Sequence, residues 1–510
     1  MSKHILVVDC GSTGIRSIIV NSNGKIINRT YKKIAIMHPE PGATENDPEH
    51  LWDVFKHVVQ KGLSIPFIKI EAIAITNQRS TFALWDKKSG KPLTNFINWQ
   101  DVRSAETARK MNKKTIWQLL RGFAFIVGRI INNPLLIVTS MLTLTTDHTI
   151  CKLRWILDKT KKFSRKDVVD NLQFGTIDTW LLYKLTGKKA HLTDYTNASS
   201  TTLLNPFMMK WNTLFCSIFK IPTNILPKVL DTNGDFGFTD PHIFGKKIPV
   251  TTLVGDQQAS LFGHHCFDPG DVKISLGSGA FVSMNVGPKP KYSKKGLFPL
   301  IAWTFNGTPT YTLEGQVATV GTYIDWAIED MGFFSSPKEL DALASECKDS
   351  NGVFCLPTLT GIKFPYFKAD LTASISGLTL RSNKSHLALS IIQGIAHRVC
   401  DVIDGMENDT KIKIPRLKMD GGVSNSDILL QTIADFSGKS VLRSSEHDLT
   451  SLGAAYFSGI SIGIWRDLKE ISKLRIPSIE FTPKISNIER ITSRKNWKKK
   501  ILQIEKEYSI

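Results

Sequence analysis

Cysteine is scarce in this sequence, and no two cysteines stand close together. The seven lie at positions 10, 151, 216, 266, 347, 355 and 400, without any C-x-x-C pair. An odd and scattered set argues against a disulfide framework and against a zinc site of the usual spacing. We therefore expect free thiols in a reducing, cytoplasmic compartment.

Long hydrophobic runs are also missing. The most apolar region, residues 116–144, is interrupted by Arg121, Arg129, Asn132, Asn133 and Pro134. A membrane span needs about 20 nearly uninterrupted apolar residues, so we expect buried or interfacial helices here and no transmembrane segment. The first apolar run, residues 5–8, reaches Asp9 too soon for a secretory signal.

Acidic residues are too few to balance the basic ones, and the formal net charge is +19. The basic residues are spread along the chain and concentrate only at residues 494–500, RKNWKKK. No nucleic-acid-binding motif accompanies them, so we expect a solvated face of a C-terminal helix and no nucleic-acid partner. With 42% hydrophobic and 22% charged residues over 510 positions, the chain reads as two or three globular domains.

Several familiar sites are absent. Residues 438–440, GKS, resemble the end of a P-loop, but Ile433 stands where its first glycine is needed. Residues 277–279, GSG, lack the third glycine of a dinucleotide fingerprint, because Val282 occupies that place. No G-x-S-x-G, H-E-x-x-H or protein-kinase set is present.

The motifs that could bind a ligand are most concentrated in residues 253–286. A strand-like run at 272–276 and another at 280–286 flank Gly277-Ser278-Gly279, and Asp256-Gln257-Gln258 follows an apolar run. A hydroxyl residue between two glycines can aim several backbone N–H groups at one phosphate. The same pattern also fits a β-hairpin whose glycines serve only the turn.

The N-terminus repeats this plan. An apolar strand over residues 4–9 leads through a glycine turn to a second strand over 16–20, and Asn23-Gly24 leads to a third over 25–30. Two such elements about 260 residues apart indicate two related domains, each presenting a phosphate-facing hairpin to a shared cleft.

Polar clusters follow other apolar segments. Residues 77–81 follow the strand-like run 70–76, and residues 420–424, DGGVS, lie between an apolar run and an amphipathic helix. Each could face a ligand or could only end its strand. Asp178, before an apolar helix over 180–185, is expected to be its N-cap.

Nine motifs in order resemble the FGGY carbohydrate kinases and, within them, glycerol kinase, while residues 79–82 (RSTF) and 145–147 (TTD) are similar to its divergent glycerol kinase-like branch of animals. The nine motifs are residues 9–13 (DCGST), 77–79 (NQR), 98–101 (NWQD), 174–180 (FGTIDTW), 194–199 (DYTNAS), 255–258 (GDQQ), 277–279 (GSG), 420–422 (DGG) and 452–455 (LGAA). Each is weak alone, but the ordered set covers nearly the whole chain.

The resemblance implies an α/β chain with two actin-like (ribonuclease H-like) ATPase domains flanking a cleft. It places an N-terminal domain at 1–254, a C-terminal nucleotide domain at 255–475 and a basic C-terminal helix at 476–510. The implied reaction is ATP-dependent phosphorylation of a small polyol, glycerol first, with Mg²⁺ as cofactor. Homo-oligomerisation stays open.

The family's site residues map onto this chain one by one. Asp256 matches the general base, and Asp9 with Asp256 the magnesium site. The polyol pocket matches Arg79, Trp99, Asp256, Gln257 and Phe281, and the nucleotide site matches Ser12, Thr13, Arg16, Ser278, Gly321 and Gly422.

The chain departs from glycerol kinases at the substrate positions. Ser80 stands where they carry an acid, and Asp147 where a tyrosine lines the glycerol site. A nucleotide-contacting glutamine falls on Asp325, and an asparagine is displaced to Asn425. Losing a buried acceptor costs about 1–3 kcal/mol. The alternatives are therefore a nucleotide-binding regulatory pseudokinase, or a kinase of another sugar or polyol.

Overall fold

A five-stranded sheet forms the framework of the N-terminal half in this computed structural model, which describes residues 3–507. Its strand order is β13-β5-β1-β2-β3. Strand β1 pairs antiparallel with β2 and parallel with β5, and β13 extends the parallel side. The strands are β1 (His4–Cys10), β2 (Gly14–Asn21), β3 (Ile26–Lys33), β5 (Ile70–Asn77) and β13 (Val250–Gly255).

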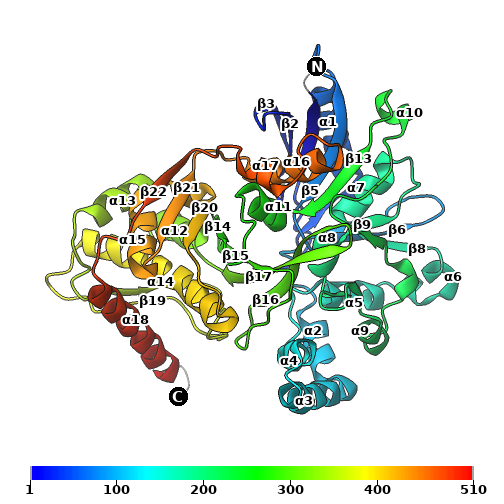
Figure 1. The fold of residues 1–510 in the computed structure, drawn as a ribbon. Coiled ribbons are helices and arrows are strands. Elements are labelled where there is room, and N and C mark those ends of the chain that lie inside the picture. The colour runs from blue at the N-terminus through cyan, green and yellow to red at the C-terminus, as the bar shows by residue number, and fades with distance from the viewer. Residues whose placement is uncertain (1–2, 508–510) are drawn as a thin grey trace.

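A seven-stranded sheet forms the C-terminal half, in the order β16-β17-β15-β14-β20-β21-β22. Its strands are β14 (Val272–Leu276), β15 (Ala280–Gly287), β16 (Phe298–Phe305), β17 (Thr308–Val317), β20 (Arg416–Asp420), β21 (Ser440–Ser444) and β22 (Ser478–Phe481). Strand β15 pairs antiparallel with both β14 and β17, whereas β20 pairs parallel with β14 and β21 pairs parallel with β20. The five strands from β17 to β21 thus repeat the N-terminal sheet, and the expected duplication is confirmed (Figure 1).

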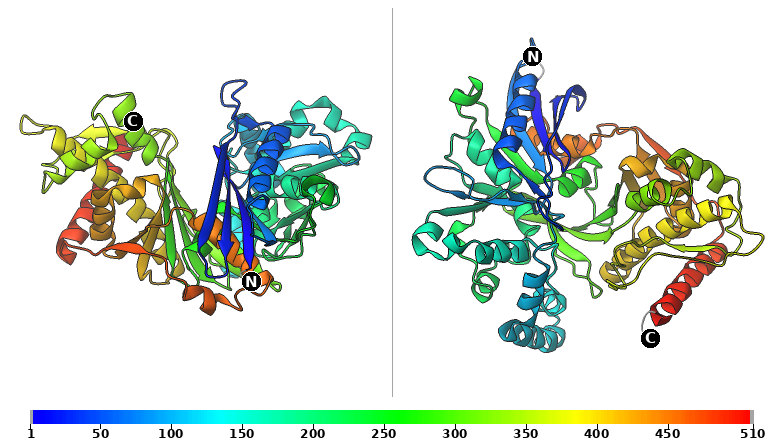
Figure 2. Two further views of the ribbon diagram at one scale, coloured as in Figure 1. Left: turned by 90° about the horizontal axis from the view of Figure 1, so that it is seen from above. Right: turned by 180° about the vertical axis from the view of Figure 1, so that it is seen from behind.

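Both faces of the N-terminal sheet are covered, which explains the continuous apolar run in β1. Leu6 and Val8 pack in one core with α1 (Pro48–Leu63) and α7 (Ile177–Leu185). Ile5 and Val7, which alternate with them, pack in another core with α11 (Asp256–Gly263) and α16 (Leu449–Ser461). Helix α16, although it follows the strands of the C-terminal sheet β14 to β21 in the chain, therefore lies against the N-terminal sheet (Figure 2).

Helices α11 and α16 cross at two glycines. A Cβ atom on Gly263 would lie 1.9 Å from the carbonyl oxygen of Leu449, and one on Gly453 would lie 1.9 Å from that of Ala259. The small-residue sequence of α16 is needed for this close approach.

A smaller sheet, β4-β7-β6-β8, adjoins the N-terminal one. Its strands are β4 (Glu45–Asn46), β6 (Phe82–Asp86), β7 (Phe96–Ile97) and β8 (Leu172–Thr176). The other elements of the N-terminal half are α2 (Ala105–Lys113), α3 (Thr115–Ile130), α4 (Pro134–Met141), α5 (Thr149–Lys159), η1 (Lys161–Ser164), α6 (Lys166–Val169), β9 (Leu192–Asp194), α8 (Tyr195–Ser199), β10 (Leu204–Asn205), β11 (Lys210–Trp211), α9 (Thr213–Ile218), η2 (Thr223–Ile225), β12 (Lys228–Leu230) and α10 (Pro241–Phe244).

The C-terminal sheet is covered by the long helix α14 and its neighbours. The elements of this half are α12 (Gly321–Glu329), α13 (Pro337–Ser345), β18 (Phe354–Leu356), β19 (Ser374–Ser376), α14 (Lys384–Thr410), η3 (Gly422–Asn425), α15 (Asp427–Ser437) and α18 (Asn487–Glu507). Helix α17 (Leu468–Ser472) packs instead with α16 in the core that contains Ile5 and Val7 of the N-terminal sheet. Within residues 3–507, no helix is long and apolar enough to cross a membrane.

Three expectations need correction. Helix α7 begins at Ile177, because β8 runs directly into it, so Thr176 is the N-cap. Asp178 lies inside the first turn and accepts hydrogen bonds from the hydroxyls of Thr176 (2.5 Å) and Thr193 (2.6 Å). Its predicted capping role is wrong.

The apolar region 116–144 contains most of α3 and all of α4, and of the two expected alternatives, buried or interfacial helices, burial is wrong for α3. Its residues Leu119, Ile126 and Ile130 are more than half exposed. The basic segment of α18 is only partly solvated: Arg494 pairs with Asp401 (2.7 Å) and Trp497 is buried, because this helix packs on α14 and α15.

Candidate active site

A cavity of about 200 Å³ lies between the two halves. Six of the predicted site residues line it: Ser12, Arg79, Trp99, Asp256, Gln257 and Phe281. Its remaining wall consists of Gln78, Ser80, Asp147, His148, Ser199, Ser200, Thr202, Phe298, Leu300, Glu314, Gly315 and Gln316. The five residues predicted for a polyol pocket therefore line one cavity, together with Ser12.

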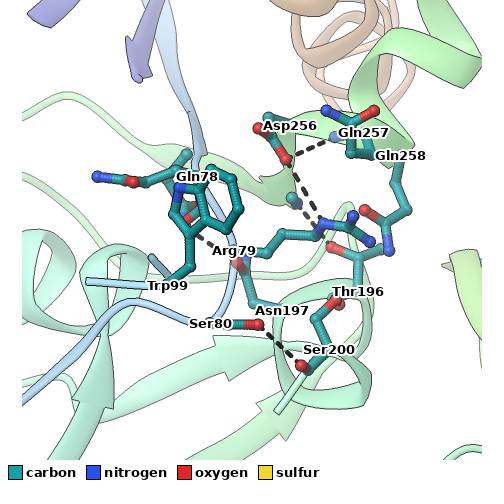
Figure 3. Close-up of polar contacts among 12 residues, drawn as sticks. Gln78, Arg79, Ser80, Trp99, Thr196, Asn197, Ser200, Asp256, Gln257 and Gln258 are labelled. Atoms are coloured by element: carbon teal, nitrogen blue, oxygen red, sulfur yellow. Dashed lines mark hydrogen bonds and ion pairs between the residues drawn. The ribbon is translucent and has the colours of Figure 1, made fainter. Parts of the chain in front are cut away.

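Asp256 occupies the first position of α11, directly after β13. Because β13 runs parallel to β5, with Gly255 opposite Asn77, the polar residues after both strands meet at one edge of the sheet. The Nε of Arg79 lies 3.5 Å from Oδ1 of Asp256, and the backbone N–H of Gln257 donates to the same oxygen at 2.8 Å (Figure 3). The carboxylate is thus held by one cation and one amide.

Burial raises the pKa of Asp256, while the nearby positive charges of Arg79 and Lys273 act to lower it. The balance favours a carboxylate that accepts a proton more readily than an exposed aspartate does.

Arg79 bridges the two halves of the chain. Its Nη2 lies 2.7 Å from Oε1 of Glu314, a residue of β17. Its Nη1, like Nε2 of Gln78, is buried without a hydrogen-bond partner among the described residues. A buried donor without a partner costs about 1–3 kcal/mol, so both atoms favour a ligand that offers oxygen acceptors.

Two aromatic rings form part of the cavity wall. The rings of Trp99 and Phe281, from different halves, approach edge to face with centroids 6.4 Å apart. The indole N–H of Trp99 donates to Oγ of Ser12 at 3.1 Å, and Ser12 donates to Oε1 of Gln78 at 3.0 Å. The cavity thus combines an apolar wall with hydrogen-bonding groups, which suits a small hydroxylated molecule.

A second group of predicted residues lies outside the cavity lining. The amide of Gly321 donates to the carbonyl of Gly277 at 3.0 Å, and that of Val320 to Ser278 at 2.8 Å. A Cβ on Gly321 would lie 3.2 Å from Val423, whereas one on Gly422 would meet nothing within 4 Å. Ser278, Gly321 and Gly422 therefore belong to three adjoining segments at the ends of strands and helices, and Gly422 borders open space.

The remaining three residues belong to the first hairpin. Asp9 of β1 lies opposite Arg16 of β2 in the strand register, and Thr13 lies in the turn between the two strands. Burial and the charge of Asp256 raise the pKa of Asp9 to about 7. Arg16 forms an ion pair with Asp448, at the start of α16.

Comparison with known proteins agrees with this geometry. Residues 4–263 match the model of the N-terminal domain of the FGGY family of carbohydrate kinases, and residues 272–462 match that of its C-terminal domain. The chain belongs to this family. The predicted membership is confirmed.

Full-length relatives of this FGGY chain include glycerol kinase 5 of Danio rerio, 38% identical over 95% of this chain and 92% of the relative. Glycerol kinase of Petrotoga mobilis is 34% identical over 98% of both chains. The structure of Plasmodium falciparum glycerol kinase with ADP superposes with a TM-score of 0.90 at 27% identity, covering 99% of this chain and 98% of that one. The predicted fold, two actin-like domains of α/β type, is confirmed.

In this FGGY chain, the two residues that depart from glycerol kinases at the substrate positions, Ser80 and Asp147, both make contacts at the cavity. The hydroxyl of Ser80 donates to the carbonyl of Ser200 at 2.9 Å, and its φ is 66°. Asp147 lines the cavity and pairs with Nζ of Lys363 at 3.1 Å. Lys363 also donates to Oε1 of Gln316 at 2.9 Å, so an ion pair between the two halves borders the cavity.

Sequence reasoning missed Glu314 and Lys273. Lys273 is buried in β14 and donates to Gln257 and, at 2.8 Å, to Oγ of Ser275. Burial lowers its pKa. The available signal was a single ionisable residue in an otherwise apolar strand, VKISL for Lys273 and YTLEG for Glu314.

Proposed function

We propose that this chain transfers the γ-phosphoryl group of ATP to a hydroxyl of glycerol, giving glycerol 3-phosphate. The observation that carries the proposal is the Asp256 carboxylate, which lies beside Arg79 in a cavity of about 200 Å³ with an aromatic wall. Relatives that match nearly the full length of this chain bear the name glycerol kinase.

Asp256 would accept the proton of the attacking hydroxyl. Its raised pKa makes it a stronger base than an exposed aspartate, while Arg79 and Lys273 favour the ionised form at neutral pH. Arg79 and Gln78 carry the unpartnered donors that would hold the other hydroxyl oxygens. Positioning of this kind supplies most of the catalysis in phosphoryl transfer.

The nucleotide would lie beyond the cavity, against the two glycine turns. Ser12, Thr13 and Arg16 on the first hairpin and Ser278 on the second would contact phosphate oxygens, since their turns present backbone N–H groups and hydroxyls. Gly321 and Gly422 would lie beside the rest of the nucleotide; the open space at Gly422 supports this placement.

Mg²⁺ fits the charges at Asp9. Its carboxylate is buried near those of Asp256 and Asp448, which raise its pKa, and a divalent cation would offset this excess of negative charge. Within the described part of the chain, no group of three or more His, Cys, Asp or Glu residues could hold a metal alone. Asp9 and Asp256 would therefore share the ion with the phosphates, where it neutralises charge.

We also propose domain limits and a compartment. Residues 1–254 form the domain with the N-terminal sheet, residues 255–475 the nucleotide domain, and residues 476–510 a basic C-terminal segment. The seven cysteines are all free and six are buried, which supports a reducing, cytoplasmic setting.

A regulatory nucleotide-binding protein is the second candidate. It is favoured by Ser80, whose hydroxyl is directed to the backbone of Ser200 rather than into the cavity. A kinase of another sugar or polyol would use Asp256 in the same way and differ only in the part of the cavity wall that contains Ser80.

The test is ADP release by the purified chain with Mg-ATP and single polyols and sugars in turn. Glycerol-dependent release supports the proposal. Release with another polyol alone would reassign the substrate, and ATP binding without substrate-stimulated release would establish the regulatory protein instead.

A further inference from the structure

Helix α3 carries an exposed stripe of large apolar side chains. Its members are Ile116, Leu119, Phe123, Ile126 and Ile130, which recur at intervals of three and four residues and therefore share one face of the helix. Each is between 54% and 76% exposed. Contiguous apolar surface of this kind marks an interaction site on a protein that folds in water.

The opposite side of α3 packs against the protein, and this leaves the stripe exposed. Trp117 is buried against Phe215 and Phe219, with ring centroids 5.0 and 5.5 Å away. Gly128 lets α4 pack closely, since a Cβ there would lie 2.8 Å from that of Leu136. The apolar hairpin formed by α3 and α4 projects from the body of the N-terminal half (Figure 1).

The charged residues within the hairpin segment itself are of one sign, although Lys110 just before it pairs with Glu106 at 2.7 Å. Residues 107–146 contain no Asp or Glu, and their basic residues are Arg109, Lys110, Lys113, Lys114, Arg121 and Arg129. Two copies of such a surface would bring like charges together, which disfavours a self-associated dimer. An apolar helical face flanked by cations is typical of helices that lie in a membrane interface.

A second basic segment reaches the tip of the hairpin from the other half of the chain. The lysine loop, residues 288–296 between β15 and β16, contains Lys289, Lys291, Lys294 and Lys295. The hydroxyl of Tyr292 in this loop donates to Oδ1 of Asn132 at 3.0 Å. None of the four lysines pairs with a carboxylate of residues 3–507 within 4.0 Å. Their charge is therefore available to a partner.

We propose that the apolar hairpin and the lysine loop together form a docking surface for an anionic lipid bilayer. The stripe of α3 enters the boundary between headgroups and acyl chains, while the lysines attract the anionic headgroups. Stable attachment to a membrane takes two such contributions, one apolar and one electrostatic. The surface is separate from the cavity, so this inference is independent of the proposed function.

The test is co-sedimentation of the full chain with vesicles of phosphatidylcholine alone or mixed with phosphatidylserine. We expect the wild type to bind the mixed vesicles, and the triple variant Leu119→Gln, Phe123→Gln, Ile126→Gln to bind about tenfold or more weakly. A matched control, Ile488→Gln with Ile491→Gln, replaces exposed isoleucines of α18 and should leave binding unchanged. Circular dichroism and ATP binding verify that each variant folds.

The electrostatic contribution is tested separately. Lys294→Gln with Lys295→Gln should weaken binding to mixed vesicles about tenfold or more, whereas Lys499→Gln with Lys500→Gln, on the exposed face of α18, should not. Absence of wild-type binding to mixed vesicles, or equal binding by the wild type and the triple variant, overturns the proposal. A concentration-dependent dimer lost in the triple variant, without vesicle binding, assigns the stripe to a second copy and also overturns it.

Discussion

Nη2 of Arg79 lies 2.7 Å from Oε1 of Glu314, joining the strand end at the carboxyl side of β5 to the middle of β17. Both side chains are about 10% exposed, so solvent screens this ion pair only weakly. The pair fixes the guanidinium beside Asp256 and sets how the two halves face each other across the cavity.

Asp256→Asn should abolish turnover. Without a carboxylate to accept the hydroxyl proton, we expect kcat to fall about 10²–10⁴-fold, whereas ATP binding should stay measurable because the proposed phosphate contacts of Ser12, Thr13 and Ser278 are retained. ADP release and calorimetric ATP titration check the two parts. Asp268→Asn, at an exposed turn, is the control, and an active Asp256→Asn enzyme would refute the assigned base.

Glu314→Gln should weaken polyol binding more than it slows the chemical step. Arg79 would lose a buried carboxylate partner and its orientation in the cavity, so KM for the polyol should rise about tenfold to a hundredfold. Steady-state kinetics at varied polyol concentration separate KM from kcat. A large loss of kcat at unchanged KM would contradict a positioning role.

Ser80→Glu should lower KM for glycerol. The substitution restores the acid that glycerol kinases carry after this arginine, and one regained acceptor is worth about tenfold in affinity. The positive φ of 66° is already adopted by a residue with a Cβ atom, so the backbone should tolerate it. Ser80→Gln controls for size, and a rise in KM for both variants would argue against the substrate assignment.

Gly453→Ala should destabilise the chain by about 1–3 kcal/mol or more, because its Cβ would lie 1.9 Å from the carbonyl of Ala259 and force α11 and α16 apart. Gly122→Ala is the matched control. Apart from its chain neighbours and the adjacent backbone of α3, no atom lies within 4 Å of the added Cβ, so the substitution should stabilise slightly. Thermal unfolding of both variants measures the contrast, which equal midpoints would contradict.

Lowering the pH should destabilise the fold through His191. Burial lowers the pKa of this imidazole to about 4, and Nε2 donates to the carbonyl of Phe174 at 2.8 Å. Because the pKa in the folded protein lies below the ordinary value of 6.5, the free energy of unfolding keeps its full value above pH 6.5. It decreases as the pH falls toward 4, where the unfolded chain binds a proton that the folded protein does not. His191→Gln should reduce this loss, by about 1–3 kcal/mol, in denaturant unfolding at pH 7 and pH 4.5. Parallel pH profiles for the two proteins would disprove it.

Local pattern was sufficient for much of the fold. Apolar runs with glycine turns predicted β1, β2, β14 and β15 close to their observed bounds, because strand propensity and turn chemistry act within a few residues. The repeat of this plan predicted the duplicated sheet. The nine ordered motifs predicted the family and thereby the residues of the cavity.

Local pattern failed where packing decides. Asp178 fits an N-cap in sequence, yet β8 enters α7 two residues earlier. The apolar residues of α3 fit a buried helix, but within α3 only Trp117, Ala124 and Gly128 are buried. Burial depends on which neighbouring elements cover a face, and that information lies far away in the chain.

The sequence by itself determined the two related sheets, the glycine turns and the residues able to act on a phosphate and a hydroxyl. Only the tertiary structure decided which of them meet. It brought Arg79 to Glu314 and Asp147 to Lys363 across separations of 235 and 216 residues. Ion pairs between such distant positions depend on how the two halves of the chain pack against each other, and no local periodicity encodes that packing.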